Sequence, residues 1–134
     1  MAEGARRPAW AEVDLEAIRH NCAVLRSIVA PARLCAVVKA DAYGHGAVPV
    51  AHAALAGGAR ELAVAIVDEG VELRDAGIDA PILVLSEPAS DAMEEVFAYR
   101  LTPTLYTAEG VALAAEAAQS AASTLQANLD TLSS

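Results

Sequence analysis

Apolar and polar residues recur along the chain with two different periods, which predict helices alternating with strands. The first helix is expected from Leu15 to about Val29, because its apolar residues return every three or four positions and share one face. Asp14 can cap this helix, and residues 30–32 end it around Pro31. Before it, residues 10–14 are expected to form a short strand, and residues 1–9 a disordered tail.

The rest of the chain continues the same alternation. Short apolar runs predict strands at Leu34–Val38, Glu61–Ile66, Ile82–Leu85 and Leu101–Tyr106, the last interrupted by Pro103. Glycines and cap residues predict four further helices. These are Ala47–Ala56, a helix capped by Asp68 that ends near Ala76, one that opens at Ser90 or Asp91 and ends near Tyr99, and one capped by Thr107 that continues past Ala118. This order is typical of right-handed βαβ units with a parallel sheet. The spacing fits a (β/α)₈ barrel and a doubly wound sheet equally well.

The strand Leu34–Val38 ends directly at Lys39, which is the only lysine of the protein, beside eight arginines. A continuous apolar run of this kind is typical of a strand buried on both faces. Burying an ammonium costs on the order of several kcal/mol unless it is paired or loses its proton, and a neutral lysine is a nucleophile for carbonyl groups. Lys39 is therefore a candidate for Schiff-base chemistry. A lysine that reaches from a strand end into water is the alternative.

The residues around Lys39 also resemble a known motif. Residues 36–46, Ala-Val-Val-Lys-Ala-Asp-Ala-Tyr-Gly-His-Gly, resemble the pyridoxal-phosphate attachment site of alanine racemases. The similarity includes residues 10–15, extends through residues 77–85, and fades after about Ala122. Members of that family carry an N-terminal (β/α)₈ barrel followed by a β-rich domain. Because a complete barrel takes about 250 residues, residues 10–122 are expected to form half of it, about four βα units, followed by an off-pattern tail at residues 123–134.

The resemblance implies a site and a reaction. It implies that Lys39 carries pyridoxal 5'-phosphate as an internal aldimine, that Tyr43 hydrogen-bonds the phosphate, and that Leu85 packs near the ring. The implied enzyme is an isomerase that interconverts L-alanine and D-alanine to supply D-alanine for peptidoglycan. In the family, which is homodimeric, the lysine serves one face of the substrate and a tyrosine from the other subunit serves the opposite face.

Two alternatives stay open beside an active racemase. The chain is expected to be truncated, which leaves open whether it is active alone. The first alternative is a non-catalytic relic or a cofactor-binding fragment, whose two unpaired sheet edges would recruit other chains. A related barrel that decarboxylates amino acids or simply carries the cofactor is the other alternative. The Ala-Asp-Ala-Tyr-Gly-His-Gly continuation after Lys39 argues against that class.

Composition narrows the class of protein further. The 134 residues have a net charge of -9 and are 55% hydrophobic, which argues against nucleic acid and anionic membranes as partners and suits small metabolites. The sequence contains no membrane-spanning run and no signal peptide, so we expect a cytoplasmic protein. Cys22 and Cys35 form no metal motif and are expected to be small buried hydrophobes.

The other polar residues are expected to have structural roles. Asp41 is expected to cap the loop after Lys39 or to tune the site, and His45 to hydrogen-bond within that loop, with acid/base catalysis as the weaker alternative. Gly44 and Gly46 are expected to serve the backbone conformation. Five acidic residues are expected to lie on solvated helix faces: Glu69, Glu72, Asp75, Glu94 and Glu95.

Overall fold

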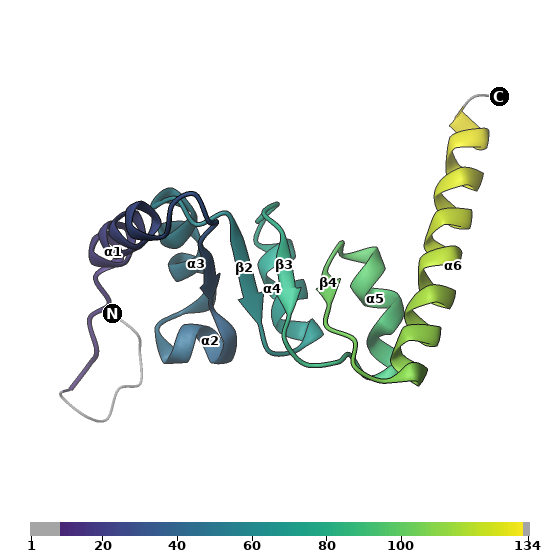
Figure 1. The fold of residues 1–134 in the computed structure, drawn as a ribbon, viewed down its shortest axis with the longest axis horizontal. Helices are drawn as coiled ribbons and strands as arrows, with labels where there is room; N and C mark the ends of the chain where they lie inside the picture. Colours follow the sequence, from purple (N-terminus) through teal and green to yellow (C-terminus); the bar gives the residue numbers. More distant parts are fainter. Residues whose placement is uncertain (1–8, 133–134) are drawn as a thin grey trace.

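The computed structural model describes residues 9–132, which form one four-stranded sheet and its surrounding helices (Figure 1). The strands are β1 (Cys35–Val37), β2 (Glu61–Val64), β3 (Ile82–Val84) and β4 (Thr102–Pro103). The helices are α1 (Leu15–Val29), α2 (Lys39–Gly44), α3 (Ala47–Ala56), α4 (Val67–Asp75), the short 3₁₀ helix η1 (Ser90–Ala92), α5 (Met93–Ala98) and α6 (Ala108–Leu132). The predicted alternation of strands and helices is confirmed.

The order of the strands decides between the two architectures that the spacing allowed. All neighbouring strands are parallel, and they follow the chain in the order β1-β2-β3-β4. A doubly wound sheet would reverse direction at a switch point, with strands added on both sides of β1. The sheet therefore has the consecutive winding of a (β/α)₈ barrel and forms an open part of one.

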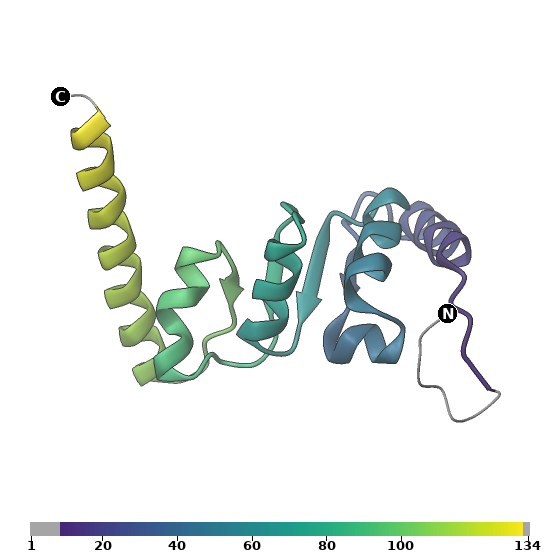
Figure 2. The same ribbon diagram turned by 180° about the vertical axis from the view of Figure 1, so that it is seen from behind.

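One face of the sheet is covered by helices and the other is open. The strands lie in front of α3 and α4 in Figure 1, and the helices lie in front of the strands in Figure 2. On the covered face the side chains of Leu62, Val64 and Ile82 are completely buried. On the open face Val37 and Leu85 are 41% and 40% exposed. The prediction that β1 is buried on both faces is therefore wrong, because none of the described residues covers its second face.

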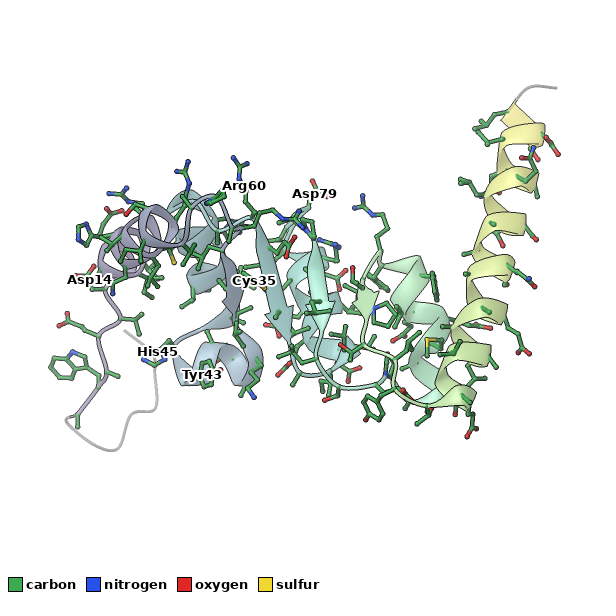
Figure 3. The ribbon with its side chains drawn as sticks, in the orientation of Figure 1. Asp14, Cys35, Tyr43, His45, Arg60 and Asp79 are labelled. Atoms are coloured by element: carbon green, nitrogen blue, oxygen red, sulfur yellow. The ribbon has the colours of Figure 1, made fainter. Side chains whose placement is uncertain are left out.

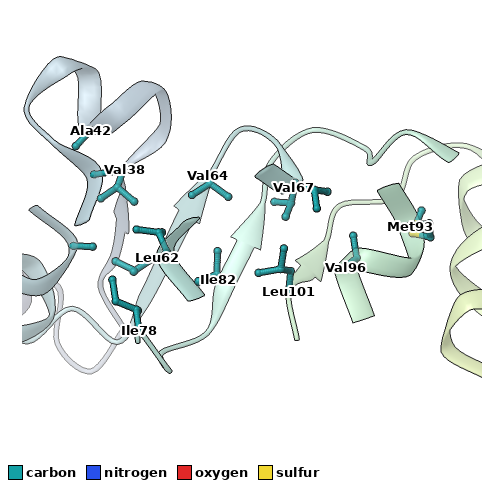
Figure 4. Close-up of a cluster of buried hydrophobic side chains, with 14 of the residues drawn as sticks. Val38, Ala42, Leu62, Val64, Val67, Ile78, Ile82, Met93, Val96 and Leu101 are labelled. Carbon is teal, nitrogen blue, oxygen red and sulfur yellow. The ribbon is translucent and has the colours of Figure 1, made fainter. Parts of the chain in front are cut away.

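The core lies between the sheet and its helices (Figure 4). It is built from aliphatic side chains, as the low aromatic content requires, and its largest fully buried members include Leu62, Leu73, Ile82 and Met93. Complete burial of such a side chain contributes about 1.5–3 kcal/mol relative to exposure. The helix α1 takes little part, since none of its residues is buried. It packs against α3, where a Cβ on Gly57 would stand 2.4 Å from the carbonyl oxygen of Arg19.

Arg74 ties together the loops at the amino ends of β3 and β4. Its guanidinium donates to the carbonyl oxygens of Ile78 at 2.6 Å, Ala80 at 2.7 Å, and Tyr99 and Arg100 at 2.9 Å. Partial burial, together with the positive charge of Arg100, lowers the pKa of Arg74. Arginine nevertheless keeps its charge in proteins, so four carbonyls share one cation at this end of the sheet.

Several expectations about the helix ends and the N-terminal residues can be compared with the structure. Asp14 caps α1, accepting from the Ala17 N–H at 3.0 Å, as predicted. The strand expected at residues 10–14 is wrong: Trp10 is 82% exposed, and no described strand lies beyond β1 to pair with this segment. Asp68 lies inside the first turn of α4 instead of capping it. The tail expected at residues 1–9 falls, except for Ala9, outside the described residues.

The last helix, α6, extends away from the sheet (Figures 1 and 2). Thr107 caps it as predicted, with its hydroxyl accepting from the Gly110 N–H at 2.9 Å. The helix continues to Leu132 and so includes most of the expected off-pattern tail. Within the part of the chain that the structure describes, no helix combines the length and apolar character needed to cross a bilayer.

Candidate functional site

The candidate residues gather at the carboxyl ends of the strands. Lys39 follows β1, and Leu85 directly follows β3, its N–H still bonded to the Val64 carbonyl at 2.9 Å. Figure 3 shows Tyr43 and His45 at this end, with Arg60 and Asp79 at the opposite end. In (β/α)₈ barrels the loops at the carboxyl ends of the strands build the active site, whereas the amino ends serve stability.

Lys39 begins a single turn of left-handed helix. Ala40, Asp41, Ala42 and Tyr43 all have positive φ angles, from 50° to 57°, with ψ between 36° and 53°. The Ala42 N–H donates to the Val38 carbonyl at 2.9 Å, which closes the turn. A left-handed helix costs roughly 1–2 kcal/mol per L-residue, so four consecutive non-glycine residues in it are rare. Such strain persists only where surrounding contacts hold it, and it concentrates at functional sites.

Hydrogen bonds on the carboxyl side hold the turn against α3. Asp41 Oδ1 accepts from the Ala47 N–H at 2.7 Å, and the Asp41 carbonyl accepts from the Gly46 N–H at 2.9 Å. His45 Nδ1–H donates to the Ala42 carbonyl at 2.8 Å. The capping role expected for Asp41 and the loop hydrogen bond expected for His45 are both confirmed. The φ angles of +83° at Gly44 and +92° at Gly46 confirm their conformational role.

Glu69 holds the other side of the turn. This residue lies in the first turn of α4, and its carboxylate accepts from the Ala40 N–H at 2.7 Å. The second carboxylate oxygen accepts from the N–H groups of Ala65 at 2.6 Å and Ile66 at 3.3 Å. The expectation that Glu69 is a solvated helix-face residue is therefore wrong. Sequence reasoning missed it because its long-range partner, Ala40, lies 29 positions away and offers only a backbone N–H.

Glu87 makes a similar connection between the loops after β3 and β4. It accepts from the N–H groups of Tyr106 and Thr107 and from the Thr107 hydroxyl. These hydrogen bonds, the one from the hydroxyl foremost, lower the pKa of the Glu87 carboxyl. A Cβ on Gly110 would stand 2.5 Å from Glu87 Oε1, so the glycine allows α6 to approach this carboxylate. Two glutamates thus fasten neighbouring loops at the carboxyl end of the sheet.

Lys39 is the one lysine or arginine at this end of the sheet among the described residues. Arg33, Arg60 and Arg100 precede β1, β2 and β4, Arg74 binds carbonyls at the amino ends, and Arg19 and Arg26 lie on α1. Lys39 is half-buried, and no described residue forms a hydrogen bond or an ion pair with its ammonium. Its side-chain nitrogen is therefore available to a ligand.

The residues present match the parts of pyridoxal phosphate. Lys39 would supply an amine for the aldehyde, and Tyr43, which is 60% exposed, would supply a hydroxyl for the phosphate. Val37 and Leu85 offer exposed apolar surface on the open face of the sheet, suited to an aromatic ring. The carboxylates of Asp41 and Glu69 accept backbone N–H groups, so their charge is partly satisfied within the protein. This set of groups fits the cofactor.

A groove of about 390 Å³ at the same end belongs to a different part of the structure. It lies between the loops after β2 and β3 and is lined by Ile66, Val67, Ser86 and the carboxylates Asp68, Glu87, Asp91 and Glu95, among others. Lys39, Tyr43 and Leu85 do not line it. Its carboxylates would repel a phosphate, so this groove is a poor site for the anionic part of the cofactor.

The cysteines and the other histidines do not add to the site. Both cysteines are half-buried and reduced, which agrees in part with the small buried hydrophobes expected. Desolvation raises the pKa of both thiols, and the Glu61 carboxylate raises that of Cys35 further, so neither is an activated nucleophile. His20 and His52 are exposed on α1 and α3. Within residues 9–132, no cluster of three His, Cys, Asp or Glu residues could hold a metal ion.

Comparison with known proteins agrees with this architecture. Residues 13–132 match the family model described as alanine racemase, N-terminal domain. The chain is 52% identical over 103 residues to an alanine racemase of Carboxydothermus hydrogenoformans, a match that covers 77% of the chain and 28% of that relative. It is 49% identical over 126 residues to alanine racemase 2 of Oceanobacillus iheyensis, covering 91% of the chain and 32% of the relative.

Solved structures lead to the same family. The crystal structure of alanine racemase from E. faecalis superposes with a TM-score of 0.78 at 39% identity, covering 85% of the chain and 31% of that structure. The alanine racemase of Clostridium difficile 630 in complex with cycloserine gives a TM-score of 0.80 at 38% identity, covering 87% and 32%. The chain thus spans 28–32% of the length of these relatives. It belongs to the alanine racemase family and corresponds to part of that family's N-terminal domain.

Proposed function

We propose that Lys39 is the attachment point of pyridoxal 5'-phosphate and that the site takes part in the interconversion of L-alanine and D-alanine. The observation that carries the proposal is the unpaired, half-buried amine of Lys39 at the carboxyl end of the first barrel strand. It is the chain's only lysine and stands on a strained turn that contacts from α3 and α4 hold in place. The chain's membership of the alanine racemase family supports the substrate.

Each residue of the site has a separate task in this proposal. Lys39 Nζ binds the cofactor aldehyde, the Tyr43 hydroxyl donates to its phosphate, and Leu85 packs against its ring. When bound, pyridoxal phosphate supplies an electron sink that makes the α-hydrogen of an amino acid acidic. Lys39 Nζ would take that proton and return it on one face of the α-carbon.

Racemisation needs a second base on the opposite face of the α-carbon. Among the described tyrosines, Tyr99 lies at the amino end of β4, where its carbonyl binds Arg74, and Tyr106 is 73% exposed beyond β4. Neither is placed opposite Lys39 by any contact in the structure. We infer that the second base comes from another part of a complete assembly, in keeping with the homodimer expected for the family. The supply of D-alanine for peptidoglycan and the cytoplasmic location belong to this same proposal.

The proposal is tested by hydrogen exchange at the α-carbon. The 134-residue chain is incubated in heavy water with pyridoxal phosphate and either L-alanine or D-alanine, with Lys39→Ala as the matched control. Pyridoxal phosphate without protein corrects for exchange in solution. One base reaches one face, so we expect Lys39-dependent exchange of one enantiomer with its configuration retained.

The outcomes separate the candidate functions. Exchange that is equal in the wild-type chain and Lys39→Ala would overturn the role of Lys39. Carbon dioxide release without exchange would instead assign the site to a decarboxylase. The remaining candidate is a cofactor-binding fragment without chemistry, which the open face around Val37 and Leu85 favours. Cofactor attached at Lys39 with no exchange of either enantiomer would establish that function.

A further inference from the structure

Glu69 is the one described side chain that joins the backbone directly after Lys39 to a neighbouring barrel loop. Its Oε1 receives the Ala40 N–H at 2.7 Å, and its Oε2 receives the N–H groups that follow β2. The residue is half-buried, and α4, which carries it, contacts α2. Hydrogen bonds between a carboxylate and an N–H are about twice as strong as neutral ones.

The role of this contact follows from the conformation of the turn. Ala40 is the first of the four residues with a left-handed backbone, so its N–H marks the point where the chain leaves β1 and reverses its hand. On the far side, Asp41 and the closing Ala42 N–H hold the turn. On the near side, the described residues provide one side-chain hydrogen bond, from the Ala40 N–H to Glu69. Without it, the Lys39–Ala40 peptide group, at the start of a turn that costs roughly 1–2 kcal/mol per residue, loses the side-chain hydrogen bond that holds its N–H.

A purely local role for Glu69 would be simpler but explains less. A glutamate at the third position of a helix commonly accepts from the N–H at the start of that helix, as Glu69 does from Ile66 at 3.3 Å. That contact is the longest of its three hydrogen bonds. The two shorter ones, at 2.6 and 2.7 Å, go to Ala65 and to Ala40, and Ala40 is outside α4 and its cap.

We propose that Glu69 is a positioning residue that anchors the left-handed turn and thereby sets the position of Lys39 for pyridoxal phosphate. The proposal rests on the proposed function where it concerns the cofactor. Glu69 acts through the Ala40 N–H and does not touch the cofactor or the substrate. Its anchoring role is measurable without any cofactor, through the backbone of Lys39 and Ala40.

The test uses Glu69→Gln, with two controls chosen from the structure. In Glu69→Gln the amide oxygen retains the two N–H groups after β2, and the amide NH₂ then faces the Ala40 N–H, a donor against a donor. Glu72→Gln makes the same charge change one turn along α4, where the carboxylate is exposed. Arg74→Gln destabilises the opposite end of the sheet, so it separates a loss of stability from a loss of positioning.

The first readout is a single NMR signal. Because Lys39 is the only lysine, carbonyl-labelled lysine combined with amide-labelled alanine gives one peak, from the Lys39–Ala40 peptide group. We expect Glu69→Gln to move this peak upfield in the proton dimension and to speed hydrogen exchange of the Ala40 amide at least tenfold. Glu72→Gln and Arg74→Gln should leave the peak position unchanged. An unchanged peak in Glu69→Gln, with unchanged exchange, would overturn the anchoring role.

The second readout is the affinity for pyridoxal phosphate, measured by its visible absorption. We expect Glu69→Gln to weaken attachment at Lys39 at least tenfold, which is about 1.4 kcal/mol, and both controls to stay within twofold of wild type. Equal affinities of Glu69→Gln and wild type would overturn the effect on Lys39. If the wild-type chain does not attach the cofactor, the proposed function fails, and the peptide signal of Ala40 still decides whether Glu69 anchors the turn.

Discussion

Replacing Ala40 by glycine should stabilise the protein, although the same change destabilises ordinary helices. Ala40 has φ +50° and ψ +53° and is exposed, so its methyl group contributes little buried surface. Glycine removes the left-handed penalty of about 1–2 kcal/mol but adds an entropy loss of about 0.5–1 kcal/mol on folding. We therefore expect Ala40→Gly to raise the free energy of unfolding by up to about 1.5 kcal/mol.

The matched control is Ala115→Gly, at an exposed position inside the right-handed helix α6. This variant should lose about 1 kcal/mol of stability, so the two glycine variants should differ by about 1–2.5 kcal/mol. Urea unfolding measures both changes, and equal m values show that the denatured state is unaffected. A loss of stability in Ala40→Gly equal to that in Ala115→Gly would refute the left-handed turn and the strain assigned to it.

Three further variants test other parts of the structure. Arg74→Ala leaves four backbone carbonyls without their shared donor. Urea unfolding should show a free energy of unfolding lower by about 2–4 kcal/mol. A change below about 0.5 kcal/mol would contradict this role of Arg74. The pKa of Glu87 is lower in the folded chain than in the unfolded one, so its stabilisation is present at neutral pH and is lost as the pH falls through its folded pKa. Glu87→Gln should therefore have a lower melting temperature than wild type at neutral pH, and its melting temperature should fall less on acidification. The exposed control Glu116→Gln should behave like wild type. If the melting temperatures of Glu87→Gln and wild type fall in parallel with pH, the hydrogen bonds assigned to Glu87 are contradicted. Tyr43→Phe should weaken attachment of pyridoxal phosphate several-fold, as measured by visible absorption. Attachment of pyridoxal, which lacks the phosphate, should be unchanged. An equal loss of affinity for the two compounds would show that Tyr43 does not bind the phosphate.

Much of the fold could be predicted from the sequence because the signals were local. Asp14, the Gly57-Gly58 pair and Thr107 mark helix ends through their own chemistry, and the apolar runs at residues 61–66 and 82–85 mark strands. The strand order could not be read in this way. Spacing alone allowed two architectures, and only the complete order decided between them, with β3 beside β2 and β4 beside β3, so that no described strand is added on the other side of β1.

The sequence pointed to the candidate loop but not to its geometry. The motif around Lys39 identified the loop, yet Ala40, Asp41 and Ala42 have no intrinsic preference for a left-handed turn. That conformation depends on tertiary contacts such as the one from Glu69, which local sequence patterns do not reveal. Exposure of the second face of β1 was missed for a similar reason, because an apolar run shows that a strand can be buried and not which elements cover it.

The central claim is that Lys39 is held as a reactive amine for pyridoxal phosphate. It is tested most directly by incubating the chain with the cofactor, reducing with borohydride and locating the added mass by peptide mapping. The competing amine is the α-amino terminus, since the chain has no other lysine. The account predicts that the native chain is labelled at Lys39 in clear preference to the terminus, and that urea-unfolded chain loses this preference. Labelling of the two amines in the same ratio in native and unfolded chain would contradict it.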